Sequence, residues 1–143
     1  MKAALVIEMI NKALTGCIPV RHYSGDCGHD LFVAAHTVIP PGEFRDVSTN
    51  VRCELPYGTW GLIIGRSSTF RKRRLLVIPG IIDNGYRGEL FTAVFNMNGS
   101  DAVLDAGDRL AQLIIMPLVT PRIEVGEVND SDRGDKGFGS TGK

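Results

Sequence analysis

The sequence predicts a single all-β domain, a barrel or a sandwich, and three observations support this prediction. Apolar runs are short, and turn-forming segments separate them at intervals of about 8–12 residues, as in barrels and sandwiches. The chain of 143 residues carries 17 Gly and 7 Pro, a composition that favours turns over long helices. Residues Val51 to Leu55 alternate apolar and polar side chains, as expected of a half-buried strand.

The expected strands follow one another along the chain with turn signals between them. We expect strands in the apolar runs Ala4–Met9, Leu31–Ile39, Val47–Leu55, Thr59–Ile64, Leu75–Ile78, Leu90–Phe95 and Leu110–Val119. Clear turn signals are Pro40-Pro41-Gly42, Pro56-Tyr57-Gly58 and Asp83-Asn84-Gly85, since these residue types accept turn conformations. Only Ser68–Arg74, and more weakly Met9–Leu14, could hold a helical turn or two, so at most one short helix is expected.

Charge and composition narrow the classes of function. Lys plus Arg and Asp plus Glu number 16 each, so the formal net charge is zero, which argues against direct nucleic-acid binding by a globally basic surface. The late apolar run Leu113–Val119 contains Pro117 and is far shorter than the ~20 residues of a membrane span. An N-terminal apolar run that stops at Glu8 is too short for a signal peptide. Three cysteines without paired spacing indicate no disulfide framework and a reducing, cytoplasmic setting.

Residues 128–143 differ in composition from the rest of the chain. They hold almost no aliphatic side chain and are rich in glycine. We therefore divide the chain into a β domain, residues 1–127, and a flexible C-terminal arm, residues 128–143. Composition alone favours a disordered end. The alternative is an arm that becomes ordered around a ligand.

The arm carries groups suited to a phosphorylated nucleotide. Its last residues fit the phosphate-loop pattern GxxxxGK, but the chain stops at Lys143 without the helix that such a loop needs, which excludes a P-loop NTPase. Arg133 offers a bidentate donor, and Ser140 and Thr141 offer hydroxyl donors. Phe138 is either a hydrophobic anchor for the arm or a ring that stacks on a base.

Further candidate groups lie where predicted strands end. Asn84-Gly85 is a strong hairpin signal. Asp83 before it is either a turn former or a carboxylate general base, with Tyr86 as a wall of the pocket. In the segment Gly65-Arg66-Ser67-Ser68, the serines either cap a helix or bind phosphate at its start. The basic run Arg71–Arg74 is either a solvated face or a source of positive potential for a polyanionic ligand.

Five segments occur in an order that is typical of one enzyme family. They are Asp26-Cys-Gly-His-Asp30-Leu-Phe-Val-Ala, Gly65-Arg-Ser-Ser, Gly80-Ile-Ile-Asp-Asn-Gly-Tyr-Arg-Gly88, Gly107-Asp-Arg-Leu-Ala-Gln-Leu-Ile-Ile115 and Arg133-Gly-Asp-Lys-Gly-Phe-Gly-Ser-Thr-Gly142. This arrangement resembles the five motifs of the trimeric deoxyuridine triphosphate nucleotidohydrolases (dUTPases). The resemblance implies a jelly-roll-like β fold, a homotrimer with active sites at subunit interfaces, and Mg²⁺-dependent hydrolysis of dUTP to dUMP and pyrophosphate. Such an activity limits uracil in DNA and supplies dUMP for thymidylate synthesis.

The resemblance also implies a role for each matching position. It implies that Asp83 orients the water that attacks the α-phosphorus and that Tyr86 packs under the deoxyribose, where a 2′-hydroxyl would not fit. It implies that Asp30 and Gln112 hold magnesium-bound waters. The other implied substrate contacts read uracil, bind phosphate or close over the nucleotide, and they are Arg66, Ser67, Ser68, Gly80, Ile81, Ile82, Phe91, Arg133, Phe138, Gly139, Ser140 and Thr141.

Two positions depart from the family pattern. Val77 stands three residues before Gly80, where many members have an asparagine that helps to read uracil. Ser68 replaces the glycine of the usual Arg-Ser-Gly, and Gly-Arg-Ser-Ser is also typical of dCTP deaminases, which share the fold. Those enzymes carry a glutamate five residues after the glycine that closes the third motif, where this chain has Ala93. The alternatives are therefore a dCTP deaminase or bifunctional relative, and a catalytically silent nucleotide-binding regulator.

Overall fold

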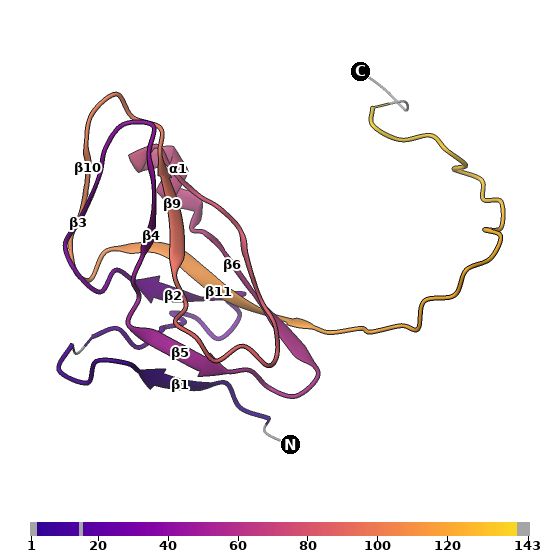
Figure 1. Ribbon diagram of the computed structural model, residues 1–143, viewed down its shortest axis with the longest axis horizontal. Coiled ribbons are helices and arrows are strands. Elements are labelled where there is room, and N and C mark those ends of the chain that lie inside the picture. Colours follow the sequence, from indigo (N-terminus) through magenta and orange to yellow (C-terminus); the bar gives the residue numbers. More distant parts are fainter. Residues whose placement is uncertain (1–2, 15, 140–143) are drawn as a thin grey trace.

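The computed structural model describes residues 3–14 and 16–139, which form a β domain and an extended C-terminal segment (Figure 1). In chain order the regular elements are β1 (Val6–Met9), β2 (Gly28–Phe32), β3 (Thr37–Ile39), β4 (Phe44–Val47), β5 (Val51–Glu54), β6 (Thr59–Gly65), α1 (Ser67–Arg73), β7 (Leu75–Val77), β8 (Gly80–Ile82), β9 (Thr92–Asn96), β10 (Ala102–Leu104) and β11 (Arg109–Pro117). The described residues thus confirm the expected all-β domain with one short helix.

The strands pair antiparallel, and most partners are distant in the sequence. β11 lies between β2 and β6 in a four-stranded sheet of order β2-β11-β6-β8, and β9 lies between β4 and β7 in a second sheet. Two smaller sheets join β1 to β5 and β3 to β10. Strands from both ends of the domain therefore meet in one sheet, and this sheet carries several of the predicted site residues.

Apolar side chains from these sheets fill one core. Val51, Cys53 and Leu55 are buried while Arg52 is exposed, which confirms the predicted alternation. Burial of one large aliphatic side chain contributes about 1.5–3 kcal/mol relative to exposure. The leucines and isoleucines with almost no exposed surface are Leu31, Ile39, Ile63, Leu75, Leu90, Leu104, Leu110 and Leu113.

The weakly predicted helix at Met9–Leu14 is absent, and the chain turns there instead. The Asn11 side-chain oxygen accepts a hydrogen bond from the Ala13 N–H, at 3.0 Å. The Asn11 N–H itself donates to the side chain of Asn50, at 2.7 Å. These side chains satisfy backbone groups that a helix would use, so a turn replaces the helix.

The hairpin predicted at Asn84-Gly85 is also wrong. The chain does turn there, because the Tyr86 N–H donates to the Asp83 carbonyl at 3.0 Å. However, β8 before the turn pairs with β6, whereas β9 after it pairs with β4 and β7. The turn therefore links two sheets, and Asp83 lies at the crossing between them.

The extended segment begins where β11 ends. The Leu118 N–H donates to the Gly58 carbonyl at 2.9 Å, which ties this point to the start of β6. From there to Gly139 the segment forms no helix or strand, and its remaining hydrogen bonds join residues within it. Within residues 3–14 and 16–139, no helix has the length and apolar character needed to cross a membrane.

Candidate active site

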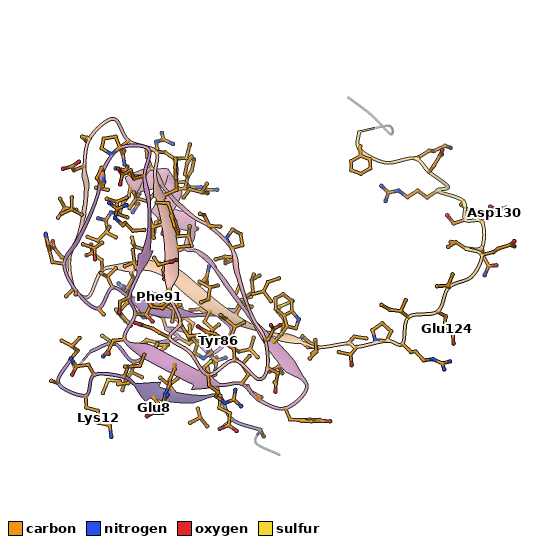
Figure 2. All side chains as sticks on the ribbon, in the orientation of Figure 1. Glu8, Lys12, Tyr86, Phe91, Glu124 and Asp130 are labelled. Atoms are coloured by element: carbon orange, nitrogen blue, oxygen red, sulfur yellow. The ribbon has the colours of Figure 1, made fainter. Side chains whose placement is uncertain are left out.

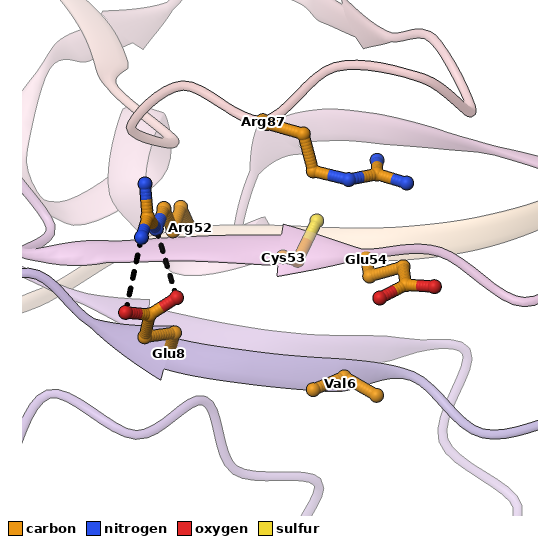
Figure 3. Close-up of a pocket in the computed structure, with 6 residues that line it drawn as sticks. All are labelled: Val6, Glu8, Arg52, Cys53, Glu54 and Arg87. Atoms are coloured by element: carbon orange, nitrogen blue, oxygen red, sulfur yellow. Dashed lines mark hydrogen bonds and ion pairs between the residues drawn. The ribbon is translucent and has the colours of Figure 1, made fainter.

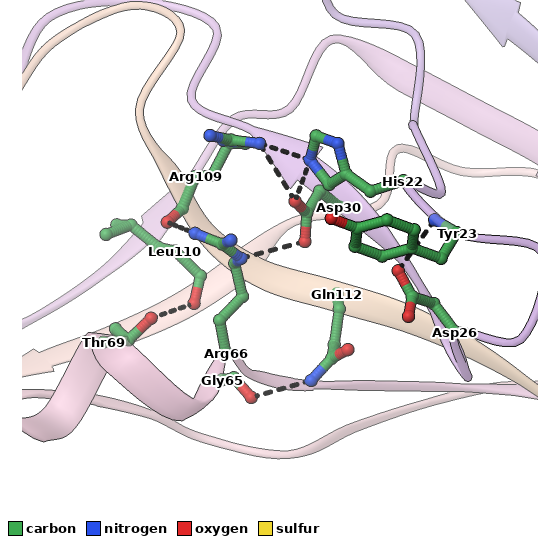
Figure 4. A network of polar contacts seen from close by, with 10 residues as sticks. All are labelled: His22, Tyr23, Asp26, Asp30, Gly65, Arg66, Thr69, Arg109, Leu110 and Gln112. Carbon is green, nitrogen blue, oxygen red and sulfur yellow. Dashed lines mark hydrogen bonds and ion pairs between the residues drawn. The ribbon is translucent and has the colours of Figure 1, made fainter.

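The carboxylate of Asp30 lies at the centre of a polar network at one end of the four-stranded sheet (Figure 4). Arg66 Nε lies 2.9 Å from one of its oxygens. His22 Nε2 and an Arg109 guanidinium nitrogen lie 3.4 and 3.5 Å from the other. Asp30 is only 7% exposed, and a buried carboxylate of this kind needs paired cations to offset its desolvation. The network therefore holds both Asp30 and Arg66 in fixed positions.

Sheet register brings the next predicted residue beside this network. Gln112 on β11 lies opposite Asp30 on β2 and opposite Ile64 on β6. Its amide nitrogen donates to the Gly65 carbonyl at 3.3 Å. A Cβ atom at Gly28 would lie 2.3 Å from the Gln112 side-chain oxygen, so only glycine leaves room for this side chain.

Helix α1 begins directly after Arg66, and two hydrogen bonds hold its first turn in place. The Arg66 N–H donates to the Leu110 carbonyl at 3.0 Å, and the buried Thr69 hydroxyl donates to the same carbonyl at 2.6 Å. The predicted serine cap is wrong, because Arg66 is the N-cap residue and no side chain caps the helix. Ser67 lines a pocket of about 250 Å³ together with Asp30, Arg66 and Gln112. We call this the phosphate-side pocket, because the resemblance implies that Arg66 and Ser67 contact phosphate. His22, Asp26 and Cys27 also line it, although the sequence did not mark them as site residues.

A second group of predicted residues lines a separate pocket of about 280 Å³. Ile81, Ile82, Asp83, Tyr86 and Phe91 all face it, and Glu89 completes its wall. Figure 2 labels Tyr86 and Phe91 in this region. We call it the base-side pocket, because the resemblance implies that Ile81 and Ile82 lie where uracil is read.

Side-chain hydrogen bonds hold the turn that carries Asp83 in place. The Asn84 side-chain amide donates to the carbonyls of Pro56 and Thr59, at 2.9 and 2.7 Å. The Tyr86 hydroxyl donates to the Glu89 carbonyl at 3.0 Å, which fixes the ring. A Cβ atom at Gly88 would lie 2.3 Å from the Tyr86 hydroxyl oxygen, so the ring packs directly over the Gly88 backbone.

The two pockets lie at different ends of β6 within one chain. Ile82 of the base-side pocket lies opposite Gly61, and Arg66 of the phosphate-side pocket follows five residues later. At about 3.4 Å per residue the two backbone positions are about 17 Å apart. One chain therefore does not bring Asp83 and Asp30 together.

The predicted arm residues lie away from both pockets. Arg133 is exposed and donates to the Lys136 carbonyl at 2.8 Å, and Phe138 is fully exposed. Phe138 and Gly139 both have positive φ values, 51° and 88°. Ser140 and Thr141 lie outside the described residues. The structure therefore shows the arm extended rather than closed.

A third pocket, which the sequence did not predict, is lined by residues of the paired strands β1 and β5 and by Arg87 (Figure 3). The Arg52 guanidinium hydrogen-bonds both carboxylate oxygens of Glu8, at 2.9 and 3.0 Å. This hydrogen bonding and the opposite charge lower the pKa of Glu8 and raise the pKa of Arg52. Burial raises the pKa of the Cys53 thiol. The ion pair between Glu8 and Arg52 is exposed, so it contributes little to the stability of the fold.

Comparison with known proteins decides the family. The dUTPase family model matches residues 15–142. The chain belongs to the dUTPase family. This dUTPase is 38% identical to the deoxyuridine 5'-triphosphate nucleotidohydrolase of Paramecium bursaria Chlorella virus 1, with 99% of both chains aligned. It is 39% identical to the Corynebacterium glutamicum protein of the same name, over 99% of this chain and 96% of that one.

Solved structures show the same fold. A mutant dUTPase of Staphylococcus bacteriophage 80alpha bound to dUpNHpp matches this dUTPase with a TM-score of 0.91 and 28% identity, over 99% of this chain and all of that one. A mutant dUTPase of S. aureus phage phi11, described with a structural Mg(II) ion, matches with a TM-score of 0.80 and 27% identity, over 87% and 97% of the two chains. These matches confirm the expected dUTPase fold.

Proposed function

We propose that this dUTPase hydrolyses dUTP to dUMP and pyrophosphate, with Mg²⁺ on the triphosphate and water attacking the α-phosphorus. The observation that carries the proposal is the full-length match to relatives named for this reaction, at 38% and 39% identity. Asp83 and Tyr86 are both present and both face one pocket, which argues against a catalytically silent member. The reaction lowers the dUTP available for incorporation into DNA and yields dUMP for thymidylate synthesis.

The phosphate-side pocket supplies the groups for the triphosphate. Arg66 offers a guanidinium, a strong bidentate donor to phosphate oxygens, and we assign Ser67 and Ser68 to the same phosphates. Positioning and charge neutralisation are what phosphoryl chemistry needs from a protein, since no covalent nucleophile is required.

The same pocket fits Mg²⁺ bound through water. The described residues contain no cluster of three or more His, Cys, Asp or Glu side chains that could hold a metal directly. Mg²⁺ keeps several waters and binds mainly to substrate phosphates, so few protein ligands are needed. The Asp30 carboxylate, already paired with Arg66 at 2.9 Å, and the side-chain oxygen of Gln112 would accept hydrogen bonds from those waters. When bound, the ion neutralises charge on the phosphates.

The base-side pocket supplies the proton acceptor and the specificity. We assign Asp83 as the carboxylate that accepts a proton from the attacking water, and Tyr86 as the ring that excludes a 2′-hydroxyl. Val77 is buried, so its side chain cannot replace the uracil-reading asparagine of many relatives. The backbone of Gly80, Ile81 and Ile82 then reads uracil, and we assign Phe91 as a further wall.

A homotrimer explains how the two pockets act on one nucleotide. The backbone positions on β6 beside them lie about 17 Å apart in one chain, whereas the α-phosphorus must be close to both. A phosphate-side pocket of one subunit facing a base-side pocket of its neighbour removes this separation. The arm, residues 128–143, then closes over the site with Arg133, Phe138, Gly139, Ser140 and Thr141. Sedimentation should give three times the chain mass of 15.5 kDa; a stable, active monomer would contradict this assembly.

A pyrophosphate-release assay across dUTP, dTTP, dCTP and UTP with Mg²⁺ tests the reaction. We expect rapid release from dUTP alone. Ammonia release from dCTP would instead indicate the deaminase alternative, although Ala93 stands where those enzymes carry a glutamate. Tight dUTP binding without any pyrophosphate would indicate a silent regulator.

A further inference from the structure

Glu89 is a half-buried carboxylate in the wall of the base-side pocket, and the proposed function leaves it without a role. Its hydrogen-bond donors are neutral. The Ser48 hydroxyl and the Asn50 backbone N–H both donate to the same carboxylate oxygen, the N–H at 2.8 Å. A carboxylate costs more to desolvate than a neutral side chain, and its charge strengthens the hydrogen bonds that it accepts. The side chain is therefore held in one place rather than solvated freely.

The donors belong to a turn that is itself fixed in the core. Residues 48–50 connect β4 to β5, and we call them the β4–β5 turn. Asn50 is 4% exposed and has a φ of 61°, a conformation that asparagine accepts better than most residues. Its side chain is hydrogen-bonded to the backbone N–H and carbonyl of Asn11, at 2.7 and 2.9 Å. The buried Thr49 hydroxyl donates to the Leu90 carbonyl at 2.6 Å. The turn is thus tied to two other parts of the chain.

The peptide unit between Glu89 and Leu90 links this turn to the Tyr86 ring. The Leu90 N–H donates to the carbonyl of Val51, the residue that follows the turn, at 2.9 Å. On the other side of the same planar unit, the Glu89 carbonyl accepts a hydrogen bond from the Tyr86 hydroxyl at 3.0 Å. Two contacts, the Leu90 N–H and the Glu89 carboxylate, therefore fix the carbonyl that holds the ring.

We infer that Glu89 is a positioning residue for sugar specificity: its carboxylate, held by the β4–β5 turn, keeps the Glu89 carbonyl where it holds the Tyr86 ring against the deoxyribose. Residues 48–50 line neither the phosphate-side nor the base-side pocket, so the turn acts through Glu89 and not by contact with the nucleotide. The inference rests on the role proposed above for Tyr86. The sequence marked neither Glu89 nor the turn as part of the site.

Two substitutions of Glu89 separate its hydrogen bonds from its charge. Glu89→Ala removes both, whereas Glu89→Gln loses the charge but keeps an oxygen that accepts from the same donors. We expect Glu89→Ala to raise KM for dUTP about fivefold, the worth of one hydrogen bond to the ring, with kcat within about twofold of the parent. KM for UTP should rise less, so the ratio of kcat/KM for dUTP to that for UTP falls. Glu89→Gln should keep this ratio within about twofold of the parent.

Asn50→Gly is the matched structural control. It leaves the backbone N–H that donates to Glu89, and glycine readily adopts a positive φ, but the side-chain hydrogen bonds to Asn11 are lost. We expect a lower thermal midpoint together with the parent ratio of kcat/KM for the two nucleotides. Partial unfolding reduces the amount of active enzyme for both nucleotides alike, so a purely structural effect does not change that ratio.

Ser48→Ala tests whether the turn acts through Glu89. It should lower the ratio in the same direction as Glu89→Ala, by about twofold, because one of the two donors remains. In the Glu89→Ala background the same change should leave the ratio unaltered, since its effect passes through that carboxylate. Should Glu89→Ala not fold, Ser48→Ala in the parent background decides the question, because it removes only one hydroxyl.

The inference is overturned if Glu89→Ala and Ser48→Ala keep the parent ratio, or if Asn50→Gly lowers it as much as they do. It is also overturned if Glu89→Gln behaves like Glu89→Ala, because the charge would then matter and not the position of the side chain. Calorimetric Kd values for dUMP and UMP give a second ratio that needs no turnover. A parent protein that binds dUMP but releases no pyrophosphate from dUTP refutes the proposed function alone, and the Kd ratio then decides the role of Glu89.

Discussion

Gly88→Ala should weaken discrimination between deoxyribose and ribose without touching any proposed catalytic group. A Cβ atom at this position would lie 2.3 Å from the Tyr86 hydroxyl oxygen, 2.5 Å from Cζ and 3.0 Å from Cε2. The ring therefore has to move, and the 3.0 Å hydrogen bond from its hydroxyl to the Glu89 carbonyl is lost.

The size of the effect follows from that one hydrogen bond. A hydrogen bond of this kind contributes about 1 kcal/mol, a factor of about five in an equilibrium or a rate. We expect kcat/KM for dUTP to fall about fivefold, and kcat/KM for UTP to fall less because its 2′-hydroxyl gains room. The assay is pyrophosphate release from both nucleotides, with thermal unfolding measured alongside to show that the domain stays folded.

Gly85→Ala is the matched control in the same turn. No atom lies within 4 Å of a Cβ atom built there, so the ratio of the two kcat/KM values should stay at the parent value. The reasoning fails if Gly88→Ala also keeps the parent ratio, because the position of the Tyr86 ring would then not set sugar specificity.

Four further predictions concern other parts of the molecule. Asp83→Asn should lower kcat by about 10²–10⁴ in the pyrophosphate assay, as loss of a general base does; near-parent turnover would move that role to another group. Asn96→Ala should lower the free energy of unfolding in urea by about 2–4 kcal/mol, because the fully buried Asn96 amide donates to two carbonyls at 2.8 Å that would lose their partner. Truncation after Asp130 should leave the urea midpoint unchanged, since the removed described residues bond only among themselves, yet abolish most turnover; equal turnover would make the arm a disordered end. Burial raises the pKa of Cys53, so the folded thiol stays neutral while the unfolded thiol ionises above about pH 8.5. Stability should therefore fall as pH rises through that value, and Cys53→Ser should remove this alkaline loss in unfolding curves compared across pH.

Local sequence patterns predicted the strands and turns that depend on neighbouring residues. They did not predict strand pairing, which depends on contacts between residues far apart in the sequence. The Val51–Leu55 strand followed from alternation, because one face of it is buried and the other is not. The Asn84-Gly85 turn was visible too, but its strands pair elsewhere because the Asn84 amide reaches carbonyls 25 and 28 residues away. β10 was missed because three residues are too few to show a period, although Leu104 is fully buried.

In the candidate site, too, the sequence predicted some residues, and others became visible only through strand pairing. Motif order placed Asp30, Arg66 and Gln112 on the list of site residues, and β2, β11 and β6 bring them into one pocket. His22 and Arg109 contact the same carboxylate, but nothing in their local sequence indicates a partner. Arg109 lies 79 residues from Asp30, so only the pairing of β2 with β11 shows that they meet. The separation of the two pockets likewise follows from register and not from spacing.

β11 lies in the middle of the four-stranded sheet, yet it is the last of the described strands to be synthesised. During synthesis β2 and β6 emerge first, yet the strand that lies between them is the last of the described domain. Until β11 is complete, both earlier strands have open edges, which invite pairing between nascent chains. Closure of this sheet must also wait for a contact across most of the polypeptide, and such contacts slow folding. Ribosome-bound chains that stop before Arg109 should therefore be more prone to aggregation than chains that extend past Pro117.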